Sequence, residues 1–195
     1  MGTELSDHLL KSRRIFLWGE VDSDSSLSVI TSLKYLADLS SSPIYLYINS
    51  EGGETQHQDA ILDEIYYCVA REIEIYIIGQ GEVCSAAAHI LCLGPPGYRF
   101  VTEHSVLMLH PVSLSLSEDY TAHQEKIVAL TRKKQEEYTR RLAKACGKTI
   151  KKFSADIQKS LWMTAKEAIR YGVCDDLWTG KFEKEVYLEG KNHEE

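Results

Sequence analysis

The sequence predicts an α/β fold built from stacked parallel βαβ units. Residues 44–48 are continuously apolar, as expected of a strand buried on both faces of a parallel sheet, and residues 73–78, apolar except for Glu74, predict a second buried strand. Each run is followed by glycines and then by apolar residues at helical spacing. Because ligands of such sheets bind beyond the carboxyl ends of the strands, candidate functional residues are expected there.

The other elements follow in chain order. The patterns predict strands at 14–18, 44–48, 73–78 and 106–109. Between them they predict a helix that begins within 22–26 and helices over 60–69 and 85–93. A glycine turn at 49–54 and a loop at 79–84 follow the second and third strands. In the last third, a long charged helix is predicted over 118–145. Thr164 and Glu167 form a capping box for a short helix that ends at Gly172, before a late strand within 173–178.

Composition narrows the classes of protein to consider. The chain has 195 residues, of which 44% are hydrophobic and 26% charged, which is typical of a folded domain. Its net charge of -7 argues against non-specific binding to nucleic acid or to an anionic membrane. No apolar run approaches the roughly 18 residues of a membrane-spanning helix. We expect a single domain over 13–179, a short N-terminal segment at 1–12 and a charged tail at 180–195.

The cysteines and the N-terminal residues indicate the cellular compartment of the protein. The five cysteines are odd in number and show no paired spacing, which favours reduced thiols. Residues 1–11 lack the basic and then apolar pattern of a signal peptide. A cytoplasmic protein is therefore expected.

Three features that could perform chemistry follow predicted strands. Ser85 opens a helix after a strand and a glycine loop, where helix amides lie beside any oxyanion that forms. His110 ends the strand at 106–109 and could exchange a proton with that serine. The backbone N–H groups of Gly53 and Ala86 would form a two-donor oxyanion hole. Taken singly, each has a structural interpretation: Ser85 as a helix N-cap, His110 as a strand end, and the Gly52–Gly53 pair as a tight turn.

Five segments together resemble the proteolytic subunit of the Clp protease. They are RRIFLWGEVD at 13–22, IYLYINSEGG at 44–53, GEVCSAAAHIL at 81–91, VLMLHP at 106–111 and MTAKEAIRYGVCDDL at 163–177. Their order and spacing are compatible with that family, in which Ser85 and His110 take the places of the nucleophile and the base.

The resemblance implies a ClpP-like, crotonase-like fold with a helical handle at about 112–146, and a serine endopeptidase that hydrolyses unfolded polypeptides. It also implies a chamber of two stacked heptameric rings, a tetradecamer, fed by an AAA+ unfoldase. ATP would be used by that partner, because this chain has no G-x-x-x-x-G-K-[ST] loop. No cofactor and no metal are expected for the chain itself.

The chain departs from the family pattern in five places. Glu51 stands where proline is usual, the loop before Ser85 is about two residues longer, and Pro111 follows His110 directly. Residues 112–117 replace a glycine-rich segment and still alternate as a strand would. The triad aspartate has no clear counterpart: Ser160 occupies its place, and Asp156 lies one helical turn earlier.

Two alternatives remain open at this stage. A weakened triad would suit a structural or regulatory ring subunit, including one mixed with an active paralogue. A crotonase-type acyl-CoA enzyme would need an acidic base, for which Glu51, Glu54 and Glu82 are the candidates.

Other chemistry-bearing residues have simpler interpretations. Cys84 is predicted to be a buried thiol, and His89 a packed or interface histidine and not the base. Tyr66 and Tyr67 are predicted to pack in the core or at an interface. The nine Lys and Arg residues between 132 and 152 favour a solvated helix face or a subunit contact over a phosphate site. His57, His104 and His123 show no zinc spacing.

Overall fold

The computed structural model describes residues 8–112 and 122–179. Its elements are β1 (Arg14–Trp18), α2 (Ser23–Leu39), β2 (Ile44–Ser50), α3 (Thr55–Ala70), β3 (Ile75–Cys84), α4 (Ala86–Leu93), β4 (Arg99–Val101), β5 (Val106–Leu109), α5 (Ala122–Ala145), α6 (Ile150–Ile157), β6 (Leu161–Thr164), α7 (Ala165–Tyr171) and β7 (Asp176–Leu177). The α/β fold predicted from the sequence is confirmed. None of the helices in these residues is long and apolar enough to cross a membrane.

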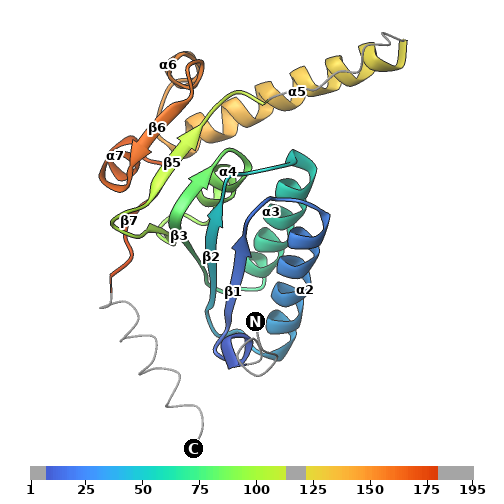
Figure 1. Cartoon of the computed structure of the whole chain (residues 1–195). Helices are drawn as coiled ribbons and strands as arrows, with labels where there is room; N and C mark the ends of the chain where they lie inside the picture. Colours follow the sequence, from blue (N-terminus) through green and yellow to red (C-terminus); the bar gives the residue numbers. More distant parts are fainter. Residues whose placement is uncertain (1–7, 113–121, 180–195) are drawn as a thin grey trace, which may run out of the picture.

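The strands form one mainly parallel sheet in the order β1-β2-β3-β4-β7. It branches at β3, whose first half pairs with β4 and whose last three residues pair with β5. β6 adds to β5 as the antiparallel edge. In Figure 1, α2 and α3 lie side by side against the sheet, and the N-terminal half of α5 projects away from it.

Alternation along β2 shows why both faces of the sheet are covered. Ile44, Leu46 and Ile48 are fully buried in the main core beneath the helices. Tyr45 and Tyr47 point to the opposite face, where they join a second, aromatic cluster with Ile78 and Phe100. The continuous apolar run therefore arises from burial on two sides, as in other parallel sheets.

One predicted boundary is wrong. Residues 79–84 were expected to be a loop, but β3 continues through them to Cys84. The register slips here, because Ile48 pairs with Gly79 while Ser50 pairs with Val83, so two residues of β2 face four of β3. The side chain of Asn49 supports this bulge by accepting a hydrogen bond from the N–H of Glu82 at 3.3 Å. A bulge of this kind keeps a strand going where glycines suggest a break.

Three elements in the second half of the chain were not predicted from the sequence. β4, α6 and β6 are all short, and β6 is partly exposed. The capping box of Thr164 and Glu167 is confirmed, and α7 ends at Gly172 with φ 99°. The long helix is confirmed from Ala122 onwards, whereas its expected start at 118–121 and most of the expected strand at 112–117 lie outside the described residues. The division of the chain at residues 13 and 179 remains a prediction.

Candidate active site

Ser85 lies at a sharp turn between β3 and α4. Its backbone has φ 53° and ψ -121°, which a non-glycine residue rarely adopts and which costs of order 1–3 kcal/mol. Two backbone hydrogen bonds fix the turn: the N–H of Ser85 donates to the carbonyl of Met108 at 2.8 Å, and its carbonyl accepts from the N–H of His89 at 3.0 Å. A strained strand-to-helix turn that presents a serine is also the arrangement of a nucleophile elbow.

The side chain of Ser85 contacts His110 instead of capping α4. Ser85 occupies the N-cap position, yet its hydroxyl makes no capping hydrogen bond. Its Oγ lies 2.8 Å from Nε2 of His110, the residue that follows β5. The pairing of the last residues of β3 with β5 brings the two together. The geometry therefore disfavours the interpretation of Ser85 as only a helix cap.

The glycine turn after β2 packs directly on Ser85. A Cβ at Gly52, which has φ 107°, would lie 2.6 Å from the Cβ of Ser85 and 3.1 Å from the nitrogen of Ala86. A Cβ at Gly53, with φ 153°, would lie 2.3 Å from the carbonyl oxygen of Val21. Only glycine fits at either position. The turn thus brings Gly52 against Ser85 and the first residue of α4, while Gly53 packs on the backbone of Val21.

The two candidate oxyanion donors are available. Within the described part of the chain, neither the N–H of Gly53 nor that of Ala86 donates a hydrogen bond. Gly53 lines the same cavity as Ser85 and His110, whereas Ala86 is buried directly behind Ser85. The four residues singled out in the sequence therefore meet at one place, although their roles in chemistry remain proposals.

The cavity beside Ser85 has a volume of about 620 Å³. Besides Ser85 and His110, its walls come from four parts of the fold: the start of α3 with the preceding turn, His89 of α4, Val112 after β5, and one face of α5. The residues from α5 are Ile127, Leu130, Thr131 and Lys134, which are spaced three and four apart and so share a face. A cavity of this size holds one or more side chains of a bound peptide.

No carboxylate among the described residues hydrogen-bonds His110. The register of β5 with β6 pairs Leu109 with Leu161, which brings Ser160 opposite His110. Ser160 is exposed and has φ 57°. The register therefore places a serine, which carries no charge, across from the histidine.

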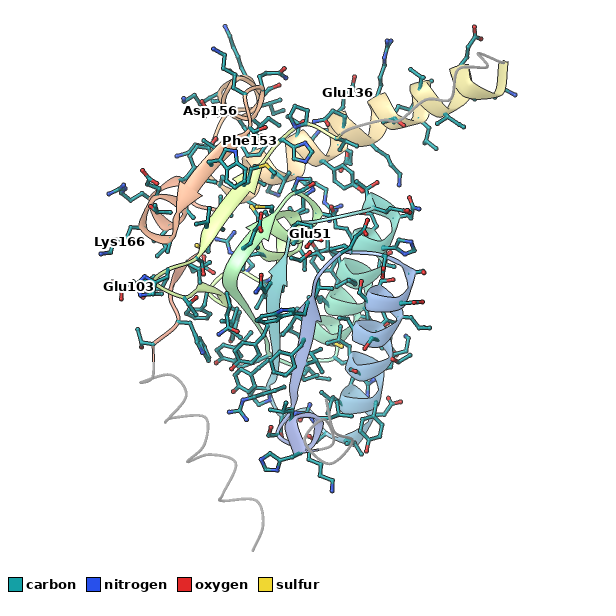
Figure 2. All side chains as sticks on the ribbon, viewed as in Figure 1. Glu51, Glu103, Glu136, Phe153, Asp156 and Lys166 are labelled. Carbon is teal, nitrogen blue, oxygen red and sulfur yellow. The ribbon has the colours of Figure 1, made fainter. Side chains whose placement is uncertain are left out.

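Asp156 does not fill that role. Figure 2 shows it on α6, near Phe153. Its carboxylate accepts hydrogen bonds from Nζ of Lys152 at 2.5 Å and from the hydroxyl of Tyr171 at 2.8 Å. These two partners, Lys152 first, lower the pKa of Asp156. Asp156 is thus held in place by α6 and α7 and is not bonded to His110.

The simpler interpretations of Cys84 and His89 are confirmed. Cys84 is 1% exposed, and burial, with a hydrogen bond to Glu82, raises the pKa of its thiol to about 12. His89 is buried, and its Nδ1 lies 2.9 Å from Oε1 of Gln58. Burial and, to a lesser extent, the nearby His110 lower the pKa of His89 to about 3, so that it is neutral at pH 7.

The structure also locates the tyrosine pair and the three acidic candidates. Tyr66 and Tyr67 are 39% and 55% exposed, so they do not belong to the core. Of the two predicted locations, a subunit interface is the one that stays a prediction. No group of three or more metal-ligating side chains occurs in the described residues. Glu51 and Glu82 are exposed, while Glu54 lines the cavity and lies 3.5 Å from Nε2 of His57.

Lys134 was missed as a site residue. In the sequence, Lys134 belongs to the basic residues between 132 and 152, which favour a solvated helix face or a subunit contact. In the structure it lines the cavity beside Ser85. The available signal was the helical stripe 127, 130, 131 and 134. Its more apolar continuation, Tyr138 and Leu142, is buried in the core, which orients the whole helix.

A parallel βαβ fold that holds a serine against a histidine at the carboxyl edge of its sheet places the chain among α/β proteins of the serine hydrolase type. The family model described as "Clp protease" matches residues 2–181, and the chain belongs to this family of proteases.

Curated relatives support this assignment. The chain is 31% identical to the "ATP-dependent Clp protease proteolytic subunit 2" of Pseudomonas aeruginosa, over 98% of this chain and 92% of the relative. It is 28% identical to "proteolytic subunit 3" of Rhizobium etli, over 93% and 91% of the two chains. It is 31% identical to "proteolytic subunit 3" of Streptomyces avermitilis, over 91% and 79%. This protein is thus a divergent subunit of the Clp protease type.

Proposed function

We propose that the chain is a serine endopeptidase that hydrolyses unfolded polypeptides with Ser85 as nucleophile and His110 as base. One observation carries the proposal: Oγ of Ser85 lies 2.8 Å from Nε2 of His110 and caps no helix. This distance is within the range over which a base removes a proton from a nucleophile. Family membership supports the same chemistry.

The proposed reaction proceeds in two steps. As Oγ of Ser85 bonds to the substrate carbonyl carbon, the hydroxyl proton passes to Nε2 of His110. The N–H groups of Gly53 and Ala86 donate to the oxyanion. The C–N bond then breaks, and His110 gives its proton to the leaving amine. In the second step His110 removes a proton from water as the water oxygen bonds to the acyl carbon. The ester bond to Oγ of Ser85 then breaks, and His110 returns the proton to Oγ.

The assembly is also part of the proposal. Two stacked heptameric rings would enclose the sites, and an AAA+ unfoldase would use ATP to feed the chamber. The chain itself would need no cofactor, and would act in the cytoplasm. The names of the relatives, which call them subunits of an ATP-dependent protease, support this arrangement.

The expected rate of peptide hydrolysis depends on His110, which has no carboxylate partner in the described residues. In serine proteases the carboxylate orients the imidazole and stabilises the imidazolium, and its loss costs roughly 10⁴-fold in rate. An oxyanion hole and substrate binding alone still provide about 10³–10⁴-fold over water. We therefore expect a slow peptidase, with an inactive ring subunit as the alternative.

The test is intact mass after exposure to a fluorophosphonate, which needs neither an unfoldase nor a chosen substrate. We expect one adduct per chain in the wild type and none in Ser85→Ala or His110→Ala. His104→Ala, which alters an exposed histidine, is the control and should be labelled like the wild type. An unlabelled wild type in its assembled form would favour the inactive subunit. Turnover of an enoyl-CoA that survives Ser85→Ala would favour the acyl-CoA enzyme.

A further inference from the structure

The cavity beside Ser85 has one apolar wall and one charged end. Val112, Ile127 and Leu130 provide the apolar surface. Ile127 and Leu130 are 37% and 57% exposed, so they are available to a ligand instead of being used by the core. Further along the same face of α5, Thr131 and then Lys134 continue the lining. A side chain that enters along α5 therefore meets aliphatic groups first and an ammonium afterwards.

Lys134 forms an ion pair with a carboxylate of α3. Its Nζ lies 3.5 Å from Oδ2 of Asp59 on α3. The same carboxylate oxygen accepts a hydrogen bond of 2.5 Å from the hydroxyl of Tyr138, which is 3% exposed. Asp59 is not part of the cavity lining, whereas Lys134 is. The carboxylate thus holds the ammonium of Lys134 at the border between this cavity and a second one, which Asp59, Lys134 and Tyr138 line together.

The other polar groups of the lining do not compete for this cation. Glu54, the one carboxylate among the described lining residues, accepts a hydrogen bond from Nε2 of Gln56 and lies 3.5 Å from Nε2 of His57. His89 is buried, neutral at pH 7 and bonded to Gln58. Among these lining residues Lys134 is the one lysine or arginine. Its 39% exposed side chain keeps access to the cavity.

The position of the cavity relative to Ser85 says which part of a peptide enters it. In the proposed reaction the substrate carbonyl lies between Ser85 and the N–H groups of Gly53 and Ala86. The P1 side chain belongs to the residue that carries this carbonyl, and it is attached to the Cα next to the carbonyl carbon. A cavity lined by both Ser85 and Gly53 is therefore the natural receptor of P1.

We propose that Lys134 is a specificity-determining residue that selects P1 side chains with an aliphatic stem and a terminal acceptor oxygen, glutamate first and glutamine second. The inference deepens the proposed function and rests on it for the identity of P1. The stem would lie along Val112, Ile127 and Leu130, and the terminal carboxylate would accept a charge-assisted hydrogen bond from Nζ of Lys134. Lysine at P1 would be rejected by repulsion.

Binding tests the proposal without requiring catalysis. The probes are fluorescein-labelled tetrapeptide amides that end in glutamate, glutamine, leucine or lysine. The amide terminus removes the free carboxylate that could itself bind Lys134. Dissociation constants are measured by anisotropy on assembled Ser85→Ala protein. We expect the glutamate peptide to bind about tenfold more tightly than the leucine peptide, as is typical of one charged hydrogen bond.

Two substitutions on α5 separate the role of Lys134 from a general effect of charge. Lys134→Met, in the Ser85→Ala background, should lower the ratio of leucine to glutamate dissociation constants to about one or below. The control Lys133→Met changes an exposed neighbour outside the lining and should keep the ratio. Raising the salt from 0.05 to 0.5 M should reduce the ratio only where Lys134 is present. A ratio that is the same in Lys134→Met as in Lys133→Met would overturn the proposal.

Kinetics separate a failure of this inference from a failure of the proposed function. In the Ser85 protein, the ratio of kcat/KM for glutamate and leucine substrates should fall about tenfold in Lys134→Met. In Lys133→Met both this ratio and the fluorophosphonate labelling should match the wild type. Labelling without any change in this ratio would reject the role of Lys134 and leave the peptidase intact. Absence of labelling, together with a glutamate preference in binding, would reject catalysis and leave the binding site intact.

Discussion

Gly52 lies so close to Ser85 that a Cβ at position 52 would be 2.6 Å from the Cβ of the serine. The same Cβ would lie 2.8 Å from the carbonyl oxygen of Cys84. Neither neighbour is the end of a flexible side chain, so any side chain at this position must displace the turn that presents Ser85. The position of the proposed nucleophile thus depends on a glycine that follows a different strand, β2.

Replacing Gly52 by alanine should therefore disable the site. We expect Gly52→Ala to lower the rate of fluorophosphonate labelling by about 100-fold or more, because a displacement of about 1 Å has that effect on a reacting group. Gly19→Ala is the matched control: it has φ 84°, and a Cβ there meets nothing within 4 Å. It should lose about 1 kcal/mol of stability from the left-handed backbone and keep its labelling rate. Equal labelling of the two variants would contradict the packing argument.

His89 should make the protein less stable in acid. Its pKa is lowered to about 3 in the folded state by burial, while an unfolded chain has a value near 6.5. Between these values the unfolded state binds the extra proton, so stability is complete above about pH 6.5 and falls as the pH is lowered toward 3. The loss from this group approaches about 1.4 kcal/mol per pH unit.

Urea unfolding at pH 7 and pH 5 measures this dependence. In His89→Asn the amide Nδ2 can replace Nδ1 as donor to Gln58, and the variant should lose less stability between the two pH values than the wild type. His104→Asn controls for the removal of an exposed histidine. A direct NMR titration of His89 gives the same answer independently; a pKa above 6 would show that the buried environment does not persist in solution.

The ion pair of Arg99 with Asp175 should contribute strongly to the free energy of unfolding. Nε and Nη2 of Arg99 donate to the two carboxylate oxygens at 3.0 and 2.5 Å, and Nη1 donates to the carbonyl of Cys92 at the end of α4. Burial alone raises the pKa of Asp175, but the hydrogen bond and charge of Arg99, with backbone N–H groups, hold it below its usual value. The pair therefore ties β4, α4 and the segment before β7 together.

Arg99→Met should lower the free energy of unfolding by about 3–5 kcal/mol, because it leaves a partly buried carboxylate without its partner. Arg140→Met is the control, since Arg140 forms an exposed pair with Glu137 on α5 and should cost less than about 1 kcal/mol. Both are measured by urea denaturation at one protein concentration, because assembly would also shift the transition. A similar loss in both variants would show that the buried pair has no special role.

The sequence predicts the parts of this fold whose signal is local. The apolar run of β2 and the capping box of α7 each depend on neighbouring residues, and the convergence of Ser85 with His110 follows from the rule that parallel strands end at one edge. β4 and β6 are too short to show a period. The continuation of β3 past Gly79 depends on Asn49, thirty residues earlier, which supports the bulge. Lys134 lies on a helical stripe that the sequence shows, but the stripe does not say that this face of α5 packs near the start of α3, where Asp59 contacts Lys134 and Tyr138.

Ser160 is the position at which the proposed activity should be improved by one substitution. It is opposite His110 across β5 and β6, it is exposed, and its φ of 57° is a conformation that aspartate and asparagine tolerate better than most residues. An aspartate there would place a negative charge beside an imidazole that has no carboxylate partner among the described residues. It would hold the ring with Nε2 toward Ser85 and stabilise the imidazolium.

We therefore expect Ser160→Asp to raise the rate of labelling, and kcat/KM for peptides, by at least about tenfold and by up to about 10⁴-fold. Ser160→Asn has nearly the same shape and backbone preference without the charge, so it should remain near the wild-type rate. The difference between the two variants isolates the carboxylate. Equal rates in Ser160→Asp and Ser160→Asn would mean that charge at this position does not limit catalysis, and that His110 obtains its stabilisation from another group in the assembled protein.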